Sequence, residues 1–187
     1  MKEEGFRIRQ QFAPHFVTFT VVGWVDLFSR KACRDILINN LKYCIEHKGL
    51  LLYAYVIMTN HVHAILSAKN GDLPNLIRDF KRFTATKIIK TIPLVHESRQ
   101  DWMLKRFEFK ARSNVRSSQH QFWTHENHAE VIYTQDFFLQ KLIYIHLNPV
   151  RAGWVEKPEE WLCSSLRNYL GMPASIEIDV MDFSIVM

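Results

Sequence analysis

Two apolar segments with the composition of β-strands, Leu50–Met58 and His61–Ser67, are separated only by Thr59-Asn60, which offers a turn. A helical segment stands on either side of this pair. Apolar residues recur at helical spacing from Ser29, a plausible cap, to His47, and again from Asp72 until Pro93. Two adjacent strands between two helices are the feature that most limits the folds open to this chain.

Further segments complete the expected order of elements. His15–Trp24 is rich in Phe, Val and Thr and is predicted to be a strand, and Gln121–Tyr133 is a candidate fourth strand. Thr134 can cap a helix from Gln135 to about Asn148, where Pro149 restricts its continuation. Residues 94–119 show no clean period and are expected to be loop-like.

The resulting order is strand, helix, strand, strand, helix, strand, helix. We predict an α+β fold with a ferredoxin-like antiparallel sheet, βαββαβ plus a C-terminal helix, and with the helices packed on one face. A chain of 187 residues fits one such domain, expected over residues 1–173, with a peripheral tail at 174–187.

Composition excludes several classes of protein. The three cysteines are far apart and in no metal-binding spacing, so neither a disulfide framework nor a zinc ribbon is indicated. No stretch approaches the roughly 18 consecutive apolar residues of a membrane span, and the first residues lack a secretory core. We therefore expect a cytoplasmic protein with no membrane partner.

Positive charge is concentrated in one part of the chain. The net charge is +5, and residues 78–116 hold eleven Lys or Arg against four acids, so this segment carries +7 and the remainder about −2. Aromatic residues lie among these charges, a mixture that suits phosphate contacts beside base stacking, although a solvated helix face with a basic loop would look the same. The candidate DNA contacts are Lys81, Arg82, Lys87, Arg106, Lys110 and Arg112.

His61 and His63 are the first candidate site. Side chains alternate faces along a strand, so both imidazoles point the same way and can hold one metal ion between them. A histidine pair this close can equally be structural. Here it interrupts an apolar segment, where buried imidazoles need partners, and a metal would supply one.

Tyr144 and Asn148 are the second candidate site. They are four residues apart and hence neighbours on one helix face. An amide oxygen is a competent metal ligand, so Asn148 could complete a His-His-Asn site with Tyr144 beside it. The alternative is that Tyr144 is a core aromatic and Asn148 a helix cap. His125, Glu126 and His128 are a weaker metal candidate, and Tyr133 and Tyr169 lack an amide four residues later.

Together these motifs resemble those of a known family. His61-Val62-His63 preceded by Met58-Thr59-Asn60, and the run from Tyr144 to Gly153, are similar to the single-tyrosine HUH transposases of insertion sequences, most of all the REP-associated tyrosine transposases. The resemblance covers about residues 12–171. Thr59 stands where many relatives have proline, which puts the local bend in question.

The resemblance implies a Mg²⁺- or Mn²⁺-dependent nuclease acting on single-stranded DNA near imperfect hairpins. His61, His63 and Asn148 would be the metal ligands and Tyr144 the nucleophile. A phenol is protonated at neutral pH, so attack needs a cation that polarises the scissile phosphate. The product would be a 5′-phosphotyrosine and a free 3′-hydroxyl, which lets a second strand end be joined without ATP.

Two other functions fit the same residues. One is a non-catalytic module that binds single-stranded nucleic acid through a sheet with aromatic and basic side chains. The other is a relaxase or replication-initiator HUH nuclease, although many of those carry a third histidine or paired tyrosines. A homodimer is also considered, in which Tyr144 serves its own metal site or that of the partner.

Overall fold

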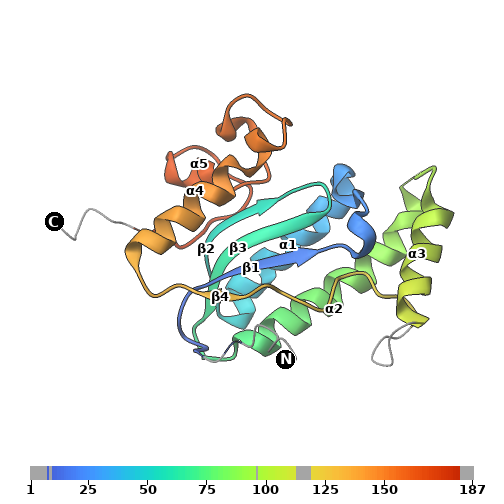
Figure 1. Ribbon diagram of the computed structural model, residues 1–187, viewed down its shortest axis with the longest axis horizontal. Coiled ribbons are helices and arrows are strands. Elements are labelled where there is room, and N and C mark those ends of the chain that lie inside the picture. Colours follow the sequence, from blue (N-terminus) through green and yellow to red (C-terminus); the bar gives the residue numbers. More distant parts are fainter. Residues whose placement is uncertain (1–7, 9, 96, 113–118, 182–187) are drawn as a thin grey trace, which may run out of the picture.

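A four-stranded antiparallel sheet forms the centre of the protein (Figure 1). The computed structural model describes residues 8, 10–95, 97–112 and 119–181. The strands lie in the order β2-β3-β1-β4, and their bounds are β1 His15–Thr20, β2 Leu50–Ile57, β3 His61–Ala68 and β4 Glu130–Val131. The predicted α+β class with an antiparallel sheet is confirmed.

Five α-helices accompany the sheet: α1 Lys31–Lys48, α2 Leu73–Thr91, α3 Gln100–Arg112, α4 Gln135–Arg151 and the short α5 Leu166–Tyr169. α1 ends where predicted, because Gly49 takes the left-handed conformation (φ 70°) that closes a helix. It begins after Arg30 rather than at a Ser29 cap, since the Ser29 hydroxyl donates to the Asp26 carbonyl instead.

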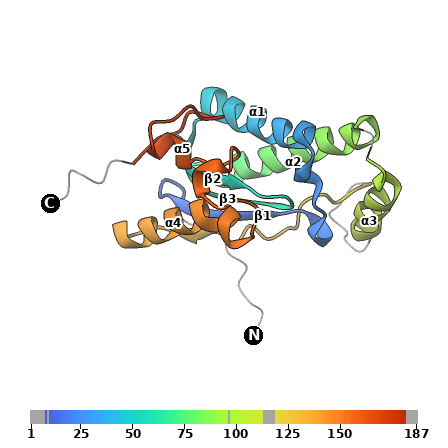
Figure 2. The ribbon, with the colours of Figure 1, turned by 90° about the horizontal axis from the view of Figure 1, so that it is seen from above.

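Helices cover both faces of the sheet (Figure 2). α1 and α2 pack on one face, against side chains such as Val17, Phe19 and Val62. α4 packs on the other face, against Phe16, Val56 and Ile65. The prediction that all helices share one face was therefore wrong for α4. The physical reason is that β1, β2 and β3 carry apolar side chains on both faces, so each face has to be covered.

The fourth strand is much shorter than the predicted Gln121–Tyr133. Only Glu130–Val131 pairs regularly with β1, and the preceding residues follow β1 through separate contacts, such as the bridge between Trp123 and Val21. Phe122 and Trp123 are adjacent and both buried, at 2% and 5% exposure. Both side chains belong to the larger core, whereas successive side chains of a regular strand point to opposite faces of the sheet.

α3 lies in the segment predicted to be a loop. Met103, Phe107 and Ala111 are buried at intervals of four residues, which is a helical stripe within residues 94–119. Phe107 packs against Phe122 with ring centroids 5.3 Å apart. Charged residues and the exposed apolar side chains of Trp102 and Phe109 surround this stripe, which hid it in the sequence.

α4 starts and is capped as predicted, since the Thr134 hydroxyl accepts a hydrogen bond from the Phe137 backbone N–H. It continues past Pro149 to Arg151, because proline in the last turn forfeits a single backbone hydrogen bond. Its position on the sheet brings Tyr144 close to β3, as described below.

The segment after α4 returns to the outer edge of β2. Ser165 hydrogen-bonds to the backbone of Tyr55, and the Tyr169 hydroxyl donates to the Tyr53 carbonyl. Further along, Ile176 is 1% exposed within the larger core, so part of the expected peripheral tail is anchored. Residues 182–187 of that tail lie outside the described residues, and the domain boundary at residue 173 stays a prediction. Within the described ranges, none of the helices has the length and apolarity needed to cross a bilayer.

Buried His146 makes the stability of this packing sensitive to pH. Its Nε2 is hydrogen-bonded to the Ser165 hydroxyl at 2.9 Å, and burial lowers its pKa to about 4. Between pH 4 and 6.5 the unfolded chain binds a proton that the folded protein excludes, so stability falls as pH falls through this window. We expect the urea midpoint to decrease from pH 7 to pH 5, and to decrease less in His146→Gln. An equal pH dependence in the variant and the wild type would contradict this role.

Candidate active site

His61 and His63 lie on the α4 face of the sheet, because residues two apart on β3 share a face. The pairing of β1 with β3 sets Thr20 opposite His61 and Thr18 opposite His63. The two imidazole centroids are 4.7 Å apart. The predicted histidine pair is thus brought together.

One nitrogen of each imidazole is already occupied. Nδ1 of His63 lies 2.8 Å from the Thr18 hydroxyl, and Nδ1 of His61 lies 2.6 Å from the side-chain oxygen of Asn60. Nε2 of His61 has no hydrogen bond among the described residues, whereas Nε2 of His63 faces the Tyr144 hydroxyl. A hydrogen bond at Nδ1 is the usual support of a histidine that binds a metal through its other nitrogen.

Both imidazoles are neutral at physiological pH. Burial lowers the pKa of His61 to about 4 and that of His63 to about 3. The positive charge of Lys141, and that of His61 once it is protonated in acid, lower the pKa of His63 further. A neutral imidazole offers a nitrogen lone pair, which is the form that binds a metal.

Tyr144 approaches the pair from α4. Its hydroxyl is 3.4 Å from Nε2 of His63, and the two ring centroids are 5.1 Å apart. Phe16 supports both groups, since it stacks on His63 at 5.4 Å and meets Tyr144 edge-on at 5.9 Å. Tyr144 is half-buried at the rim of the smaller core, so its apolar ring is packed while its hydroxyl reaches a polar group.

A cleft of about 330 Å³ opens beside this phenol, and its lining is Phe16, Thr18, His63, His128, Glu130, Gln140, Lys141 and Tyr144. Lys141 is 2.9 Å from a Glu130 carboxylate oxygen and 4.3 Å from the centre of the Phe16 ring. The Arg151 guanidinium lies 5.6 Å from the centre of the Tyr144 ring. Two cations therefore flank the phenol, an electrostatic setting suited to a phosphate.

Asn148 lies one turn beyond Tyr144 on the same helix. Its backbone carbonyl accepts from the Ala152 N–H, and its half-buried side chain makes no hydrogen bond within the described part of the chain. No hydrogen bond joins it to His61 or His63 among the described residues, and its role as a ligand stays a prediction. Across the described ranges, no group of three or more His, Cys, Asp or Glu side chains gathers to hold a metal.

Comparison with known proteins adds to this geometry. The profile of a family described as IS200-like transposases matches residues 10–121, more than half of the chain. The chain belongs to the IS200-like transposase family. The matched region includes His61 and His63 but ends before α4, the helix that carries Tyr144.

One solved structure shows the same fold, and a second is less similar. A REP-associated tyrosine transposase bound to a REP hairpin has 18% sequence identity and a TM-score of 0.59, over 95% of this chain and 93% of that one. A putative transposase from Deinococcus radiodurans has 16% identity and a TM-score of 0.44, over 78% of this chain and 95% of that one. No curated protein matches the sequence significantly.

The predicted DNA contacts divide into three groups in this transposase. Lys81 is enclosed, because its ammonium donates to the Thr124 carbonyl and the Asn127 side chain at 2.7 Å each, and burial lowers its pKa to about 8. It ties α2 to the segment beside β1 and is not presented to a DNA backbone, which corrects its sequence assignment. Arg82 and Lys87 are exposed on α2, on the sheet face opposite His63.

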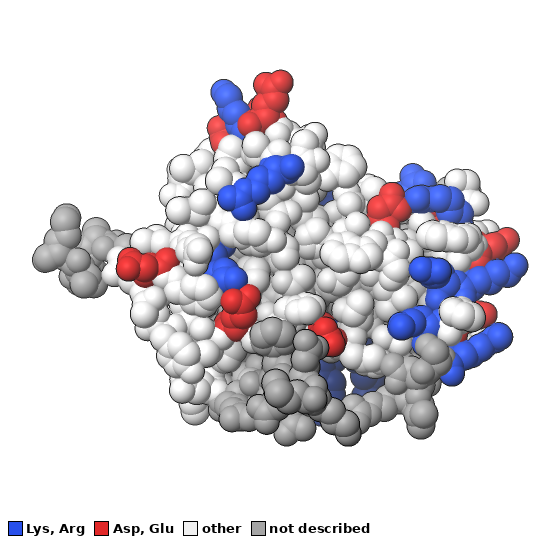
Figure 3. Space-filling model, in the orientation of Figure 1, with Lys and Arg blue, Asp and Glu red and all other residues white. Residues whose placement is uncertain are grey.

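The third group lies on α3. Arg106, Lys110 and Arg112 are exposed there, and Figure 3 shows Lys and Arg side chains gathered at this end of the molecule. Arg116, the last basic residue of the charged segment, lies outside the described residues. Whether any of these side chains binds DNA stays a prediction.

Sequence reasoning missed two side chains of the site, Thr18 and Lys141. Alternation along His15–Trp24 would have set Thr18 on one face, but its partner depends on the register of β1 against β3, which no local signal gives. Lys141 is three residues before Tyr144, a spacing that shares a helix face and could have been noticed.

Proposed function

We propose that this transposase is a metal-dependent single-stranded DNA endonuclease and strand transferase that forms a 5′-phosphotyrosine at hairpin-associated sites. The observation that carries the proposal is the 3.4 Å approach of the Tyr144 hydroxyl to Nε2 of His63. Membership of the IS200-like family supports it. The hairpin bound by the REP-associated transposase of the same fold suggests the kind of DNA substrate.

The chemistry of the donor set fits a divalent cation. His61 and His63 are neutral and are hydrogen-bonded at Nδ1. A cation would bind at Nε2 of each ring, at His63 in place of the 3.4 Å contact with the Tyr144 hydroxyl, and Asn148 would add an amide oxygen. Imidazoles suit several transition metals, while amide and phosphate oxygens suit Mg²⁺ or Mn²⁺, and we propose one of these two ions. When bound, the cation would neutralise charge on the scissile phosphate.

The residues of the chain have distinct tasks in the proposed reaction. The Tyr144 oxygen attacks the phosphorus, the bond between phosphorus and the 3′ oxygen breaks, and a proton passes through solvent from the phenol to that oxygen. Phe16 holds the phenol and the His63 ring in fixed relative positions. Lys141 and Arg151 favour the approach of the negatively charged strand. Attack of a second 3′-hydroxyl on the phosphotyrosine reverses these bond changes and joins a new end.

A covalent adduct tests the nucleophile. The probe is a DNA hairpin with single-stranded flanks, labelled at its 5′ end in one sample and at its 3′ end in another. After incubation with Mn²⁺, wild-type protein should carry the 3′ label on denaturing gels, because the tyrosine is joined to the fragment on the 3′ side of the cut. Tyr144→Phe lacks the attacking oxygen, so its adduct should fall at least about 1,000-fold. Tyr133→Phe, an exposed tyrosine, is the matched control and should react normally. An undiminished adduct in Tyr144→Phe would remove the proposal.

The Thr18 hydroxyl tests the orientation of His63. Thr18→Val removes the 2.8 Å contact with Nδ1 at nearly constant volume, and loss of such a support lowers metal affinity about 10- to 100-fold. Isothermal titration with Mn²⁺ measures this directly. Thr86→Val, which removes an exposed hydroxyl on α2, should bind Mn²⁺ as the wild type does. Equal affinity in all three proteins would show that Thr18 does not position the imidazole.

A further inference from the structure

Trp24 combines three unusual properties next to the histidine pair. Its backbone has φ of 57°, a left-handed conformation that bulky side chains rarely adopt. Its side chain is 64% exposed despite its size. Its ring centroid lies 5.8 Å from that of His61, with the planes at 74°. Backbone strain of this kind persists only where surrounding contacts maintain it, and it concentrates at functional sites.

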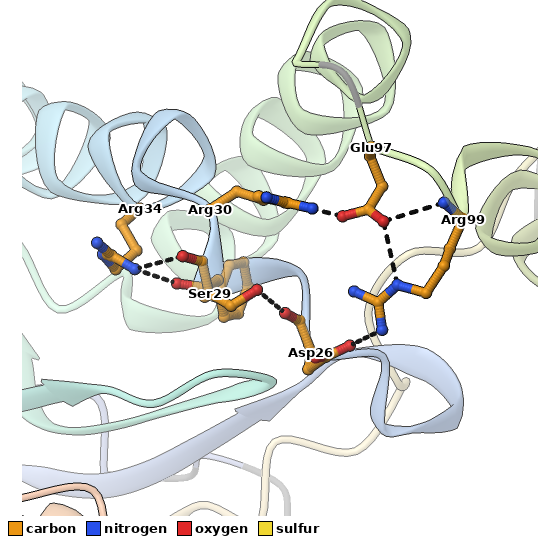
Figure 4. Close-up of polar contacts among 7 residues, drawn as sticks. Asp26, Ser29, Arg30, Arg34, Glu97 and Arg99 are labelled. Carbon is orange, nitrogen blue, oxygen red and sulfur yellow. Dashed lines mark hydrogen bonds and ion pairs between the residues drawn. The ribbon is translucent and has the colours of Figure 1, made fainter.

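Ionic contacts hold the turn that carries Trp24 (Figure 4). Asp26, two residues later, pairs with Arg99 at 2.9 Å. Arg99 also binds Glu97 at 3.0 Å, and Glu97 binds Arg30 at 2.8 Å. Glu97 is 2% exposed, and the hydrogen bonds from Arg99 and Arg30 lower its pKa to about 2. On its C-terminal side, the turn is thereby tied through Asp26 to the segment before α3, and that segment is tied through Glu97 to Arg30 at the start of α1.

Gly23 adds a second restraint on the same turn. It has φ of 68°, and a Cβ at this position would lie 2.8 Å from Nε of Arg106. The α3 side chain therefore packs directly on the turn. The exposed indole is fixed in place rather than left over at a loose loop tip.

A second cleft, of about 350 Å³, lies beside Trp24 and is lined by Thr20, Trp24, Lys110, Gln121, Thr124, His125, Glu126 and His128. It shares His128 with the cleft at Tyr144. Phe16, Thr18 and Thr20 alternate onto one face of β1 and line the two clefts in order. The two clefts therefore adjoin at His128 along one face of β1, with Trp24 lining one of them and His63 and Tyr144 lining the other.

We propose that Trp24 is the stacking platform for one unpaired nucleobase of the strand that passes the histidine pair. The proposal rests on the function proposed above and adds a nucleotide subsite to it. An exposed indole offers a flat apolar face, and exposed Arg106 and Lys110 on the adjacent α3 suit the phosphates on either side of the base. The bases of a continuous duplex have both faces covered by their neighbours, so the occupant is single-stranded.

The test measures DNA binding in the Tyr144→Phe background, where no bond can be cut. The probe is a fluorescein-labelled DNA hairpin with about 12 unpaired nucleotides on each side, and a matched series carries one abasic site at each unpaired position. Fluorescence anisotropy with Mn²⁺ gives the dissociation constant of each combination. Trp24→Ala should weaken binding of the intact probe at least about fivefold, and Trp24→Phe should recover most of the loss.

The decisive result is that the effect of Trp24→Ala on binding depends on one particular nucleotide of the probe. At one abasic position, Trp24→Ala and its parent should bind equally, because the base that the indole contacts is already missing. Phe83→Ala, which removes an exposed aromatic from α2 on the opposite sheet face, should show normal affinity throughout. Unchanged affinity in Trp24→Ala, or the same fold loss at every abasic position, would overturn the platform.

A structural role for Trp24 predicts a different outcome. Trp24→Gly removes the ring but suits a positive φ, so its melting temperature should be at least that of the parent while its DNA binding falls as in Trp24→Ala. A lower melting temperature together with normal DNA affinity would show that the ring serves the fold instead. Failure of the proposed function is distinguishable from failure of the stacking platform. If the proposed function is wrong, wild-type protein forms no covalent adduct, and this result does not depend on the abasic series.

Discussion

The site depends on the register in which β1 pairs with β3. In this register Thr18 lies opposite His63 and Thr20 opposite His61, so one face of β1 supplies the residues that support and flank the imidazoles. A slip of one residue would turn Phe16 and Thr18 to the other face and would remove both the hydrogen bond at Nδ1 of His63 and its aromatic support. Burial on both faces of these strands makes such a slip costly. The packing that stabilises the fold therefore also positions the side chains that would do the chemistry.

The second requirement is that α4 covers the face on which the histidines lie. Leu142 and Ile145 are buried in the smaller core, and Tyr144 packs against that core. The Tyr144 hydroxyl is directed toward His63. At the far end of the helix, His146 contacts Ser165, which is bonded to β2, so the segment after α4 ties the helix to the sheet edge. The geometry of the phenol thus depends on contacts formed by residues more than a hundred positions apart in the chain.

Much of the fold followed from local patterns. Strand-like runs predicted β1, β2 and β3, capping and spacing predicted α1, α2 and α4, and alternation predicted that His61 and His63 share a face. The errors arose where tertiary packing decides. α4 covers the second face because both faces are apolar. The buried stripe of α3 was obscured by surrounding charges and by exposed Trp102 and Phe109. The fourth strand is irregular where Phe122 and Trp123, adjacent in the chain, enter the same core. Thr18 and Trp24 could not be assigned, since the partner of Thr18 depends on strand register and the position of Trp24 on a turn held by distant ion pairs.

The central claim is that one divalent cation, held by the histidine pair and an amide, lies within reach of a phenol. Crystals soaked with MnCl₂ and measured for anomalous scattering test it most directly. The expected result is a single strong peak in contact with Nε2 of His61, Nε2 of His63 and the side-chain oxygen of Asn148, with the Tyr144 hydroxyl beside it. A soak that gives no peak at the histidine pair, or a peak bound only near His125 and His128, would contradict it.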